Sequence, residues 1–259
     1  MGTRILIKIG GRAFDGNKAF KDLAAAIKSN TDLEVIIVHG GGAEISQALK
    51  AAHRETVFID GIRVTAADDI KIVEKVLSGT INHRIASQLN ANGVACRRMS
   101  GKTAQLFMVE PLTRKGQDFG HVGKIKQVNA GVVVKALKNR QVPIISPVSA
   151  DETGKSYNVN ADSAAAALAA SAQCTDLVFI TDVSGVMVGE SVCHFLTIQE
   201  AKTLIADGTI KGGMVAKMES AFEALDNEVP RVHIIQWQGP HTLRNIITGD
   251  CTAGTVIQR

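Results

Sequence analysis

Short runs of apolar, mostly β-branched residues alternate along the chain with segments in which apolar residues recur every three or four positions. Residues 4–9 and 33–38 are runs of the first kind, and each ends at glycines, which predicts two strands that end in tight turns. Helical spacing follows each run, in Phe20, Leu23, Ala24 and Ile27 and then in Ile45, Ala48, Leu49 and Ala52. This order predicts parallel strands joined by right-handed crossovers.

The middle of the chain has a more mixed pattern, typical of an antiparallel excursion followed by a return to alternating strands and helices. The elements that it predicts are two helices within 66–92 broken near Ser78-Gly79, strands at 105–110 and 122–128, a helix at about 130–139, a strand at 142–146 and an alanine-rich helix from about 158 to 172.

The last third repeats the alternation of strands and helices. A strand at 176–181 is followed by Thr197-Ile-Gln-Glu200, which has the form of a capping box and predicts a helix start. Another helix begins at Gly212-Gly213, and the chain finishes with strands at 232–236 and 254–257. The whole pattern predicts an α/β fold with two lobes, residues 1–173 and 174–259, that share one continuous sheet.

The composition excludes several classes of function. The net charge of +4 over 259 residues is too small and too scattered to predict nucleic-acid binding, and one Trp, one Tyr and eight Phe leave little material for base stacking. No apolar run is long enough to span a membrane, and no leader precedes the first strand. The cysteines lie far apart without a C-x-x-C pair, which predicts a cytoplasmic protein with neither a disulfide framework nor a cysteine zinc site; they are Cys96, Cys174, Cys193 and Cys251.

Glycine clusters at the ends of predicted strands are the first chemical signal. They are Lys8-Ile-Gly10-Gly11, His39-Gly40-Gly41-Gly42 and Lys211-Gly212-Gly213. Ligands bind outside the carboxyl ends of strands in open parallel sheets, and the N–H groups at a helix start attract anions. Tight turns without a ligand would explain one such cluster, but three clusters, two of them beside a lysine, predict a cradle for phosphate or carboxylate.

The familiar nucleotide-binding motifs do not account for these clusters. No G-x-G-x-x-G follows the first strand. Ser100-Gly101-Lys102-Thr103 resembles the end of a Walker A loop, but that motif requires glycine at position 96, which is Cys96. The sequence therefore excludes a P-loop NTPase, and we expect an ordinary loop at Gly101.

Three charged residues combine with the glycines into a pattern that favours phosphoryl transfer. Lys8 interrupts an apolar strand, which is costly unless its ammonium reaches an anion, and Lys217 follows the third glycine cluster. Asp162 lies at the start of the alanine-rich helix, where alone it would be a favourable helix-dipole residue. Phosphoryl transfer needs alignment and positive charge around the equatorial oxygens, which two lysines oriented by a carboxylate would supply.

The combined pattern resembles the amino acid kinase family. The matching segments, in the order and spacing of the family across nearly the whole chain, are Ile7-Lys-Ile-Gly-Gly11, Val38-His-Gly-Gly-Gly42, Asp60-Gly-Ile-Arg-Val-Thr65, Tyr157-Asn-Val-Asn-Ala-Asp162, Thr181-Asp-Val-Ser-Gly-Val186, Gly212-Gly-Met-Val-Ala-Lys217 and Gly254-Thr-Val-Ile257. The resemblance implies a three-layer αβα sandwich. It also implies ATP-dependent phosphorylation of the side-chain carboxylate of N-acetyl-L-glutamate, an early step of arginine biosynthesis.

The resemblance further implies roles for individual residues. Lys8 and Lys217 would stabilise the transferring phosphoryl group, and Asp162 would hold both lysines. The remaining residues that it implies are Gly41, Gly42, Arg63 and Asn158 at the acyl amino acid, with Arg63 on the α-carboxylate, and Gly10, Gly11, Asp182, Val183, Ser184, Gly185, Val186, Met187, Thr209, Ile210 and Lys211 at the nucleotide. Mg²⁺ would arrive with ATP, so no metal ligand of the protein itself is expected.

The same resemblance implies the assembly and the division of labour. The lobe of residues 1–173 would bind the acyl amino acid and dimerise, and that of residues 174–259 would bind ATP. The first strand begins about four residues from the start, which leaves no room for the extra N-terminal helix of arginine-regulated members, so an unregulated homodimer is expected.

Two alternatives stay open. The substrate would be a different N-acylated acidic amino acid, such as N-succinylglutamate or an N-modified aminoadipate, if the pocket differs in size. A catalytically silent ligand sensor on the same fold is the other reading, but such a protein is expected to have lost Lys8, Asp162 or Lys217, and all three are present.

Overall fold

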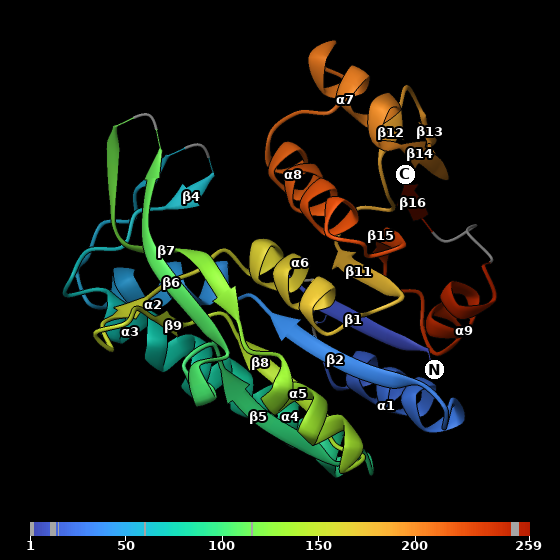
Figure 1. Ribbon diagram of the computed structural model, residues 1–259, viewed down its shortest axis with the longest axis horizontal. Helices are drawn as coiled ribbons and strands as arrows, with labels where there is room; N and C mark the ends of the chain where they lie inside the picture. The colour runs from blue at the N-terminus through green and yellow to red at the C-terminus, as the bar shows by residue number, and fades with distance from the viewer. Residues whose placement is uncertain (1–2, 11–13, 15, 60, 115, 250–253) are drawn as a thin grey trace.

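An eight-stranded sheet extends through the computed structural model, which describes residues 3–10, 14, 16–59, 61–114, 116–249 and 254–259 (Figure 1). In order across the sheet, the strands are β14 (Phe195–Thr197), β16 (Gly254–Gln258), β15 (Arg231–Gln236), β11 (Asp176–Thr181), β1 (Arg4–Ile9), β2 (Glu34–His39), β8 (Val142–Ser146) and β5 (Cys96–Ser100). Neighbouring strands are parallel except β15 and β16, which are antiparallel. The first strand of the chain therefore lies inside the sheet, between β2 and β11.

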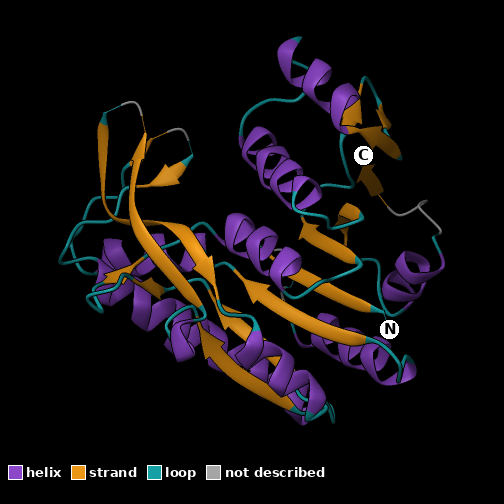
Figure 2. Cartoon of the chain, viewed as in Figure 1, coloured by secondary structure: helices purple, strands orange, loops and turns teal. Residues whose placement is uncertain are grey.

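Helices cover both faces of this sheet, which confirms the predicted αβα sandwich with a mainly parallel sheet (Figure 2). The helices that pack on one face are α5 (Gly131–Lys138), α6 (Ala161–Ser171), α7 (Ile198–Ala206) and α8 (Gly213–Asp226). Those on the other face are α1 (Asn17–Ser29), α2 (Gly42–Ala51), α3 (Ile70–Glu74), α4 (Asn82–Ala91) and α9 (His241–Thr248).

The strand period of two decides which side chains of β1 face which layer. Ile5 and Ile7 pack in the core on the α1 side, whereas Leu6 packs in the core on the α6 side. Lys8 is two residues beyond Leu6 and therefore points toward α6. This register places a lysine ammonium at the carboxyl end of a central strand, next to the first turn of a helix.

A second, mainly antiparallel sheet projects from the N-terminal half, where the sequence predicts an antiparallel excursion. It contains the long hairpin of β6 (Phe107–Arg114) and β7 (Gln117–Val128). Two short strands extend the sheet beyond β6, first β9 (Ser149–Ala150) and then β10 (Ser156–Tyr157). A small hairpin of β3 (Phe58–Ile59) and β4 (Ile62–Arg63) lies close to it, and both stand across α6 from α8 (Figure 1).

One predicted boundary is wrong. The expected break near Ser78 and Gly79 is absent, because α3 continues through a π-helical segment, η1 (Lys75–Ile81), directly into α4. Arg98 Nη2 donates to the carbonyls of Ser78 at 2.9 Å and Gly79 at 3.5 Å, and the Ser78 hydroxyl lies 2.6 Å from that of Ser146. These tertiary contacts stabilise a segment whose serine and glycine alone would favour a break.

The C-terminal third agrees with the sequence except for a few elements that it did not predict. The capping box is confirmed, since the Thr197 hydroxyl accepts from the Glu200 amide and the Glu200 carboxylate accepts from the Thr197 amide. The unpredicted elements in this third are helix α9, edge strand β14 and the short hairpin of β12 (Met187–Val188) and β13 (Ser191–Val192). Earlier in the chain, the short strands β3, β4, β9 and β10 and the 3-10 turn η2 (Thr103–Gln105) were not predicted either. No helix among the described residues is long and apolar enough to cross a membrane.

Candidate active site

Three chain segments meet at the carboxyl end of β1. Gly40 follows β2 directly, and a Cβ atom placed on it would lie 3.8 Å from the Ala161 Cβ at the start of α6 and 4.0 Å from the Lys8 Cε. The N-terminal ends of α2 and α6 therefore lie on either side of the Lys8 side chain. No side chain caps the start of α2, so its first N–H groups suit an anion site.

Asp162 joins two lysines that come from opposite ends of the sequence. Its Oδ1 lies 2.8 Å from Lys8 Nζ, and its Oδ2 accepts a hydrogen bond from Lys217 Nζ at 3.0 Å. All three side chains are largely buried, with exposed fractions of 11%, 16% and 12% for Lys8, Asp162 and Lys217. The structure thus brings together the three residues that the sequence assigned to phosphoryl transfer.

Local structure fixes the position of Asp162. The side chain of Asn160 caps α6, and its Oδ1 accepts from the amides of Asp162 at 2.8 Å and Ser163 at 3.2 Å. The cap sets the start of the helix, so that Asp162 occupies the first turn and faces the strand ends. Asn160 is therefore the N-cap residue that positions Asp162.

The charges of this cluster support one another. Burial disfavours the ionised form of Asp162, but the ammonium groups of Lys8 and Lys217 outweigh it and hold the pKa of the carboxyl below its ordinary value. Burial is also the largest influence on Lys217 and lowers its pKa, against the opposing effect of Asp162. The Lys217 ammonium lies 4.9 Å from the centre of the Phe179 ring, which adds a cation–π contact.

Gly10 leaves room for the Lys8 ammonium. A Cβ atom at position 10 would lie only 2.4 Å from Lys8 Nζ, so any side chain there would displace the lysine. This close approach explains the glycine by space rather than by backbone conformation. Gly11, the other predicted residue of this cluster, lies outside the described residues.

A cavity of about 210 Å³ opens beside the lysine cluster. It is lined by Lys8 and Asp162 of the charged cluster. The four residues predicted to bind the acyl amino acid line the same cavity; they are Gly41, Gly42, Arg63 and Asn158. The rest of the lining is largely apolar and includes Ile45, Phe58, Ile62, Leu77, Val122 and Val159. A small acidic molecule with an apolar portion matches this lining.

Several contacts position the Arg63 side chain in the wall of the cavity. Its Nη2 donates to the Gly42 carbonyl and to the Ser46 hydroxyl, both at 2.8 Å, and its guanidinium lies 4.7 Å from the centre of the Phe58 ring. Burial lowers the pKa of Arg63 from its ordinary value, although a guanidinium stays charged. No motif in the sequence marked Ser46 or Phe58 as its partners.

Asn158 connects the cavity to the antiparallel sheet. Its side-chain amide donates to the Thr65 hydroxyl at 3.3 Å, and its backbone N–H donates to the His121 carbonyl at 2.8 Å. His121 itself donates through its backbone to the carbonyl of Thr65. The β7 strand therefore supports the predicted substrate-side asparagine, while the His121 side chain binds the carbonyl of Ser156 at 2.9 Å.

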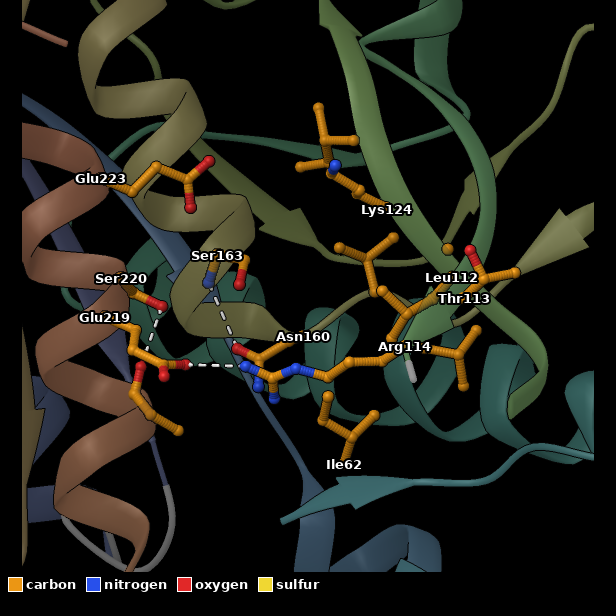
Figure 3. Close-up of a pocket in the computed structure, with 15 residues that line it drawn as sticks. Ile62, Leu112, Thr113, Arg114, Lys124, Asn160, Ser163, Glu219, Ser220 and Glu223 are labelled. Carbon is orange, nitrogen blue, oxygen red and sulfur yellow. Dashed lines mark hydrogen bonds and ion pairs between the residues drawn. The ribbon is translucent and has the colours of Figure 1, made fainter. Parts of the chain in front are cut away.

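A larger cavity of about 370 Å³ lies between the β6–β7 hairpin and α8 (Figure 3). The two cavities adjoin, because they share four lining residues: Ile62, Val122, Val159 and Asn160. Arg114 reaches across it from the hairpin to Glu219 of α8, with 3.5 Å between Nη2 and Oε2. The sequence did not predict this contact, since nothing in either segment indicates that the two face each other.

The nucleotide residues predicted in the C-terminal lobe lie in two segments that are exposed apart from three residues. Asp182, Val183, Ser184 and Met187 follow β11 and are exposed, as are Thr209 and Lys211 before α8. Gly185, Val186 and Ile210 are buried instead. The Val186 amide donates to the Thr255 hydroxyl at 2.8 Å and its carbonyl accepts from the Cys193 amide, so its polar groups already have partners.

The first of these loops lies near the charged cluster. Asp182 is close enough to Lys217 to favour its charged form, although burial has the larger effect on that lysine and its pKa is lowered overall. The exposed glycines Gly212 and Gly213 begin α8, two turns or less from Lys217. The start of α8 has no side-chain cap, so its N–H groups suit an anion near Lys217. Among the described residues, no group of three or more His, Cys, Asp or Glu side chains is arranged to hold a metal ion.

Comparison with known proteins agrees with this geometry. The sequence profile of the amino acid kinase family matches residues 3–236. The acetylglutamate kinase of Methanocaldococcus jannaschii is 36% identical over all of this chain and 91% of its own length, and that of a Thermoanaerobacter species is 38% identical over 99% of this chain and 87% of its own.

A solved structure of a Streptococcus mutans UA159 protein has the same fold. It superposes with a TM-score of 0.83 at 28% identity, and the match covers 98% of each chain. The sequence profile, the full-length relatives and the carboxylate-bridged lysine pair all lead to the same assignment. The chain belongs to the amino acid kinase family.

Proposed function

We propose that this protein transfers the γ-phosphoryl group of ATP to the side-chain carboxylate of N-acetyl-L-glutamate, forming N-acetyl-L-glutamyl 5-phosphate and ADP in arginine biosynthesis. The observation that carries the proposal is the Lys8–Asp162–Lys217 cluster, which borders a cavity that also contains Arg63. Two relatives named acetylglutamate kinase match this chain over nearly its whole length, which supports the choice of substrate.

The cavity suits a dicarboxylate whose amino group is blocked. Arg63 and Lys8 both line it; the Arg63 guanidinium would pair with the α-carboxylate, and Lys8 would lie beside the carboxylate that reacts. The apolar side chains of Ile62, Val122 and Val159 would contact the acyl group, with the Asn158 amide nearby as a hydrogen-bond donor. Gly41 and Gly42 at the start of α2 would direct N–H groups at the reacting carboxylate.

The proposed reaction requires charge stabilisation and alignment rather than proton transfer. A side-chain carboxylate oxygen forms a bond to the γ-phosphorus, and the bond from that phosphorus to the β,γ-bridging oxygen breaks, so that ADP leaves with the electron pair. The acceptor is already ionised near neutral pH, and no general base is needed. Lys8 and Lys217 would stabilise the equatorial oxygens in the transition state, and Asp162 would hold both ammonium groups in place.

Nucleotide binding is proposed for the C-terminal lobe, residues 174–259, and acyl amino acid binding and dimerisation for residues 1–173. Asp182, Val183, Ser184 and Met187 would contact the nucleotide from one loop, and Thr209 and Lys211 from the other. Gly10 would lie beside the phosphates, next to Lys8. Mg²⁺ bound to the phosphates would neutralise charge that develops between them, and the phosphates would supply most of its ligands.

We also propose a homodimer in the cytoplasm. Strand β5 ends the central sheet and carries the exposed Arg97 and Arg98, next to the η1–α4 helix, so that edge is available to a second copy. Three cysteines in the described part of the chain, Cys96, Cys174 and Cys193, are free thiols, which supports a reducing compartment. Sedimentation of the purified protein would test the dimer directly.

A coupled assay of ADP release, with ATP, Mg²⁺ and a panel of acidic amino acids, tests the reaction. We expect turnover with N-acetyl-L-glutamate and little with unacylated glutamate, whose charged amino group faces the apolar wall. N-succinylglutamate and an N-acylated aminoadipate belong in the panel because the second cavity adjoins the first. Absence of ADP release with every acylated acid would refute the proposal and favour a ligand sensor on the same fold.

A further inference from the structure

His39 is the last residue of β2 and lies immediately before the glycines that border the cavity. It is 1% exposed, and both of its ring nitrogens have partners. Nδ1 lies 3.0 Å from the Gly40 carbonyl oxygen, and Nε2 lies 3.2 Å from the side-chain nitrogen of Asn82. Neither partner belongs to the proposed reaction, so the reaction itself leaves this histidine unexplained.

The partners of the ring determine its protonation. A carbonyl oxygen only accepts, so Nδ1 must carry the hydrogen, and an amide NH₂ only donates, so Nε2 must carry the lone pair. The ring is therefore a neutral imidazole in the Nδ1–H tautomer. Burial agrees with this assignment, because it lowers the pKa of His39 to about 4, with weaker and opposing influences from the Gly40 carbonyl, Arg84, Glu44 and Lys8.

The orientation of the Asn82 amide is fixed independently of the histidine. Its two Nδ2 hydrogens are shared among three acceptors, which are the His39 ring, the Ile144 carbonyl at 2.9 Å and the Met99 carbonyl at 3.2 Å, while its Oδ1 accepts from Arg98 Nε at 3.0 Å. A flipped amide would place its oxygen against these carbonyls. Asn82 follows the π-helical segment directly, so this segment sets where the amide meets the ring.

The hydrogen bond at Gly40 has a consequence on the other side of the peptide. In a planar trans peptide, the carbonyl of one residue and the N–H of the next point in opposite directions. Because the Gly40 carbonyl points at the buried ring, the Gly41 N–H points away from it. Gly41 lines the cavity, and a Cβ atom on it would lie 2.2 Å from the Ile81 Cδ1 and 2.9 Å from the Leu77 Cδ2, so the loop is also held against η1.

We propose that His39 is a positioning residue: by donating from Nδ1 to the Gly40 carbonyl, it turns the Gly41 N–H toward the reacting carboxylate, and Asn82 fixes the tautomer that makes this donation possible. The inference rests on the proposed function for the reaction that it serves. A general-base role is excluded by the same contacts, because both ring nitrogens are occupied and the acceptor carboxylate has no proton to remove.

Two substitutions separate the two hydrogen bonds of the ring. The side-chain amide of asparagine overlaps the Nδ1 position of histidine, so His39→Asn keeps a donor for Gly40. That of glutamine reaches the Nε2 position, so His39→Gln keeps a partner for Asn82 and loses the donor for Gly40. His39→Leu removes both bonds. Comparison of the three variants distinguishes an effect on the orientation of the glycine loop from an effect of merely filling the space that the ring occupies.

We expect His39→Leu and His39→Gln to lower kcat about tenfold to a hundredfold, which is the usual effect of losing a group that orients a reacting one. His39→Asn should recover most of the lost kcat, while KM for ATP changes little in all three. Wild-type kcat in His39→Gln, or equal loss in His39→Asn and His39→Leu, would overturn the proposal.

A measurement on the unmodified protein guards against variants that fail to fold. Nitrogen-15 NMR of labelled histidine should show one ring as the neutral Nδ1–H tautomer at pH 7, unprotonated down to about pH 5, and the His39→Asn spectrum identifies its signals. An Nε2–H tautomer or an imidazolium at pH 7 would overturn the inference whether or not the protein phosphorylates N-acetyl-L-glutamate. A protein with this tautomer but no turnover would refute only the proposed function.

Discussion

Lys217 of α8 and Asp162 of α6 are joined by a 3.0 Å hydrogen bond between helices whose starts lie some fifty residues apart in the sequence. Asp162 also binds Lys8, so a lysine from the start of the chain and one from its last third share a single carboxylate. Positive charge from both halves of the sequence is thus held at one point.

Replacing Lys217 with alanine should lower kcat about a hundredfold or more, because its ammonium would act mainly on charge that develops in the transition state. KM for N-acetyl-L-glutamate should change much less. Steady-state kinetics of ADP release measure both constants. Lys138→Ala, an exposed lysine on α5, is the matched control and should behave as wild type. Turnover of Lys217→Ala close to that of the control would contradict the assigned role.

Gly10→Ala should impair catalysis through Lys8. The added Cβ would lie 2.4 Å from Lys8 Nζ, so the ammonium must move away from its position beside Asp162. We expect kcat to fall about tenfold or more, the scale on which misplaced catalytic groups act, with a small change in melting temperature because the obstacle is the flexible end of a side chain. Gly79→Ala provides the comparison, since nothing lies within 4 Å of its added Cβ.

Arg63→Ala should act on binding rather than on turnover. Loss of the guanidinium removes the partner of the α-carboxylate, and KM for N-acetyl-L-glutamate should rise about tenfold to a hundredfold, the range expected for a charge-assisted pair. KM for ATP should stay near its wild-type value. Arg244→Ala, which removes an exposed arginine on α9, controls for the loss of positive charge. An unchanged KM for the acyl amino acid would place that substrate elsewhere.

Asp176 predicts a pH-dependent contribution to stability at the far end of the sheet. It is fully buried and accepts from His233 Nε2 at 2.8 Å and Arg231 Nη2 at 3.1 Å. Burial favours its protonated form, but these hydrogen bonds outweigh it and lower its pKa below the ordinary value of 3.8. A lowered carboxyl pKa stabilises the fold above the unfolded-state pKa, and the contribution is lost as the pH falls through the folded-state value.

Asp176→Asn should therefore lower the free energy of unfolding at pH 7 by about 3 kcal/mol, the scale of breaking a buried ion pair. Urea denaturation at several pH values measures the difference between the variant and wild type. That difference should stay constant from pH 7 to about pH 5 and shrink below pH 4. A constant difference down to pH 2 would show that the charge of Asp176 contributes nothing.

The sequence predicts most of the central sheet because β1, β2, β8, β11 and β15 are mainly apolar runs, and the first two end in glycines. Helix α9 escaped prediction, since it is short and follows a Gly-Pro pair that is typical of a turn. The break expected at Ser78 and Gly79 was wrong for a different reason: Arg98, from a strand twenty residues away, binds the carbonyls that a break would expose. Such long-range contacts leave no local pattern.

The candidate site shows the same division. Lys8, Asp162 and Lys217 were predictable because each is a charged residue beside glycines or a helix start, and the structure brings them together. The contacts of Ser46 and Phe58 with Arg63 were not predictable, because these residues belong to no motif and meet Arg63 only through tertiary packing. The motifs that contain Val186 and Ile210 also did not indicate that these two side chains are buried.

The place of β1 inside the sheet has a consequence for synthesis of the protein. One edge of β1 pairs with β2. The other edge pairs with β11, which begins about 170 residues later in the chain. While the ribosome makes the intervening chain, that apolar strand keeps an unpaired edge that other chains can pair with. Because β1 and β11 are far apart in the sequence, their pairing is slow to form, and with it a large part of the sheet. We therefore expect nascent chains that end before β11 to aggregate unless chaperones shield them, and full-length chains to escape once β11 has emerged.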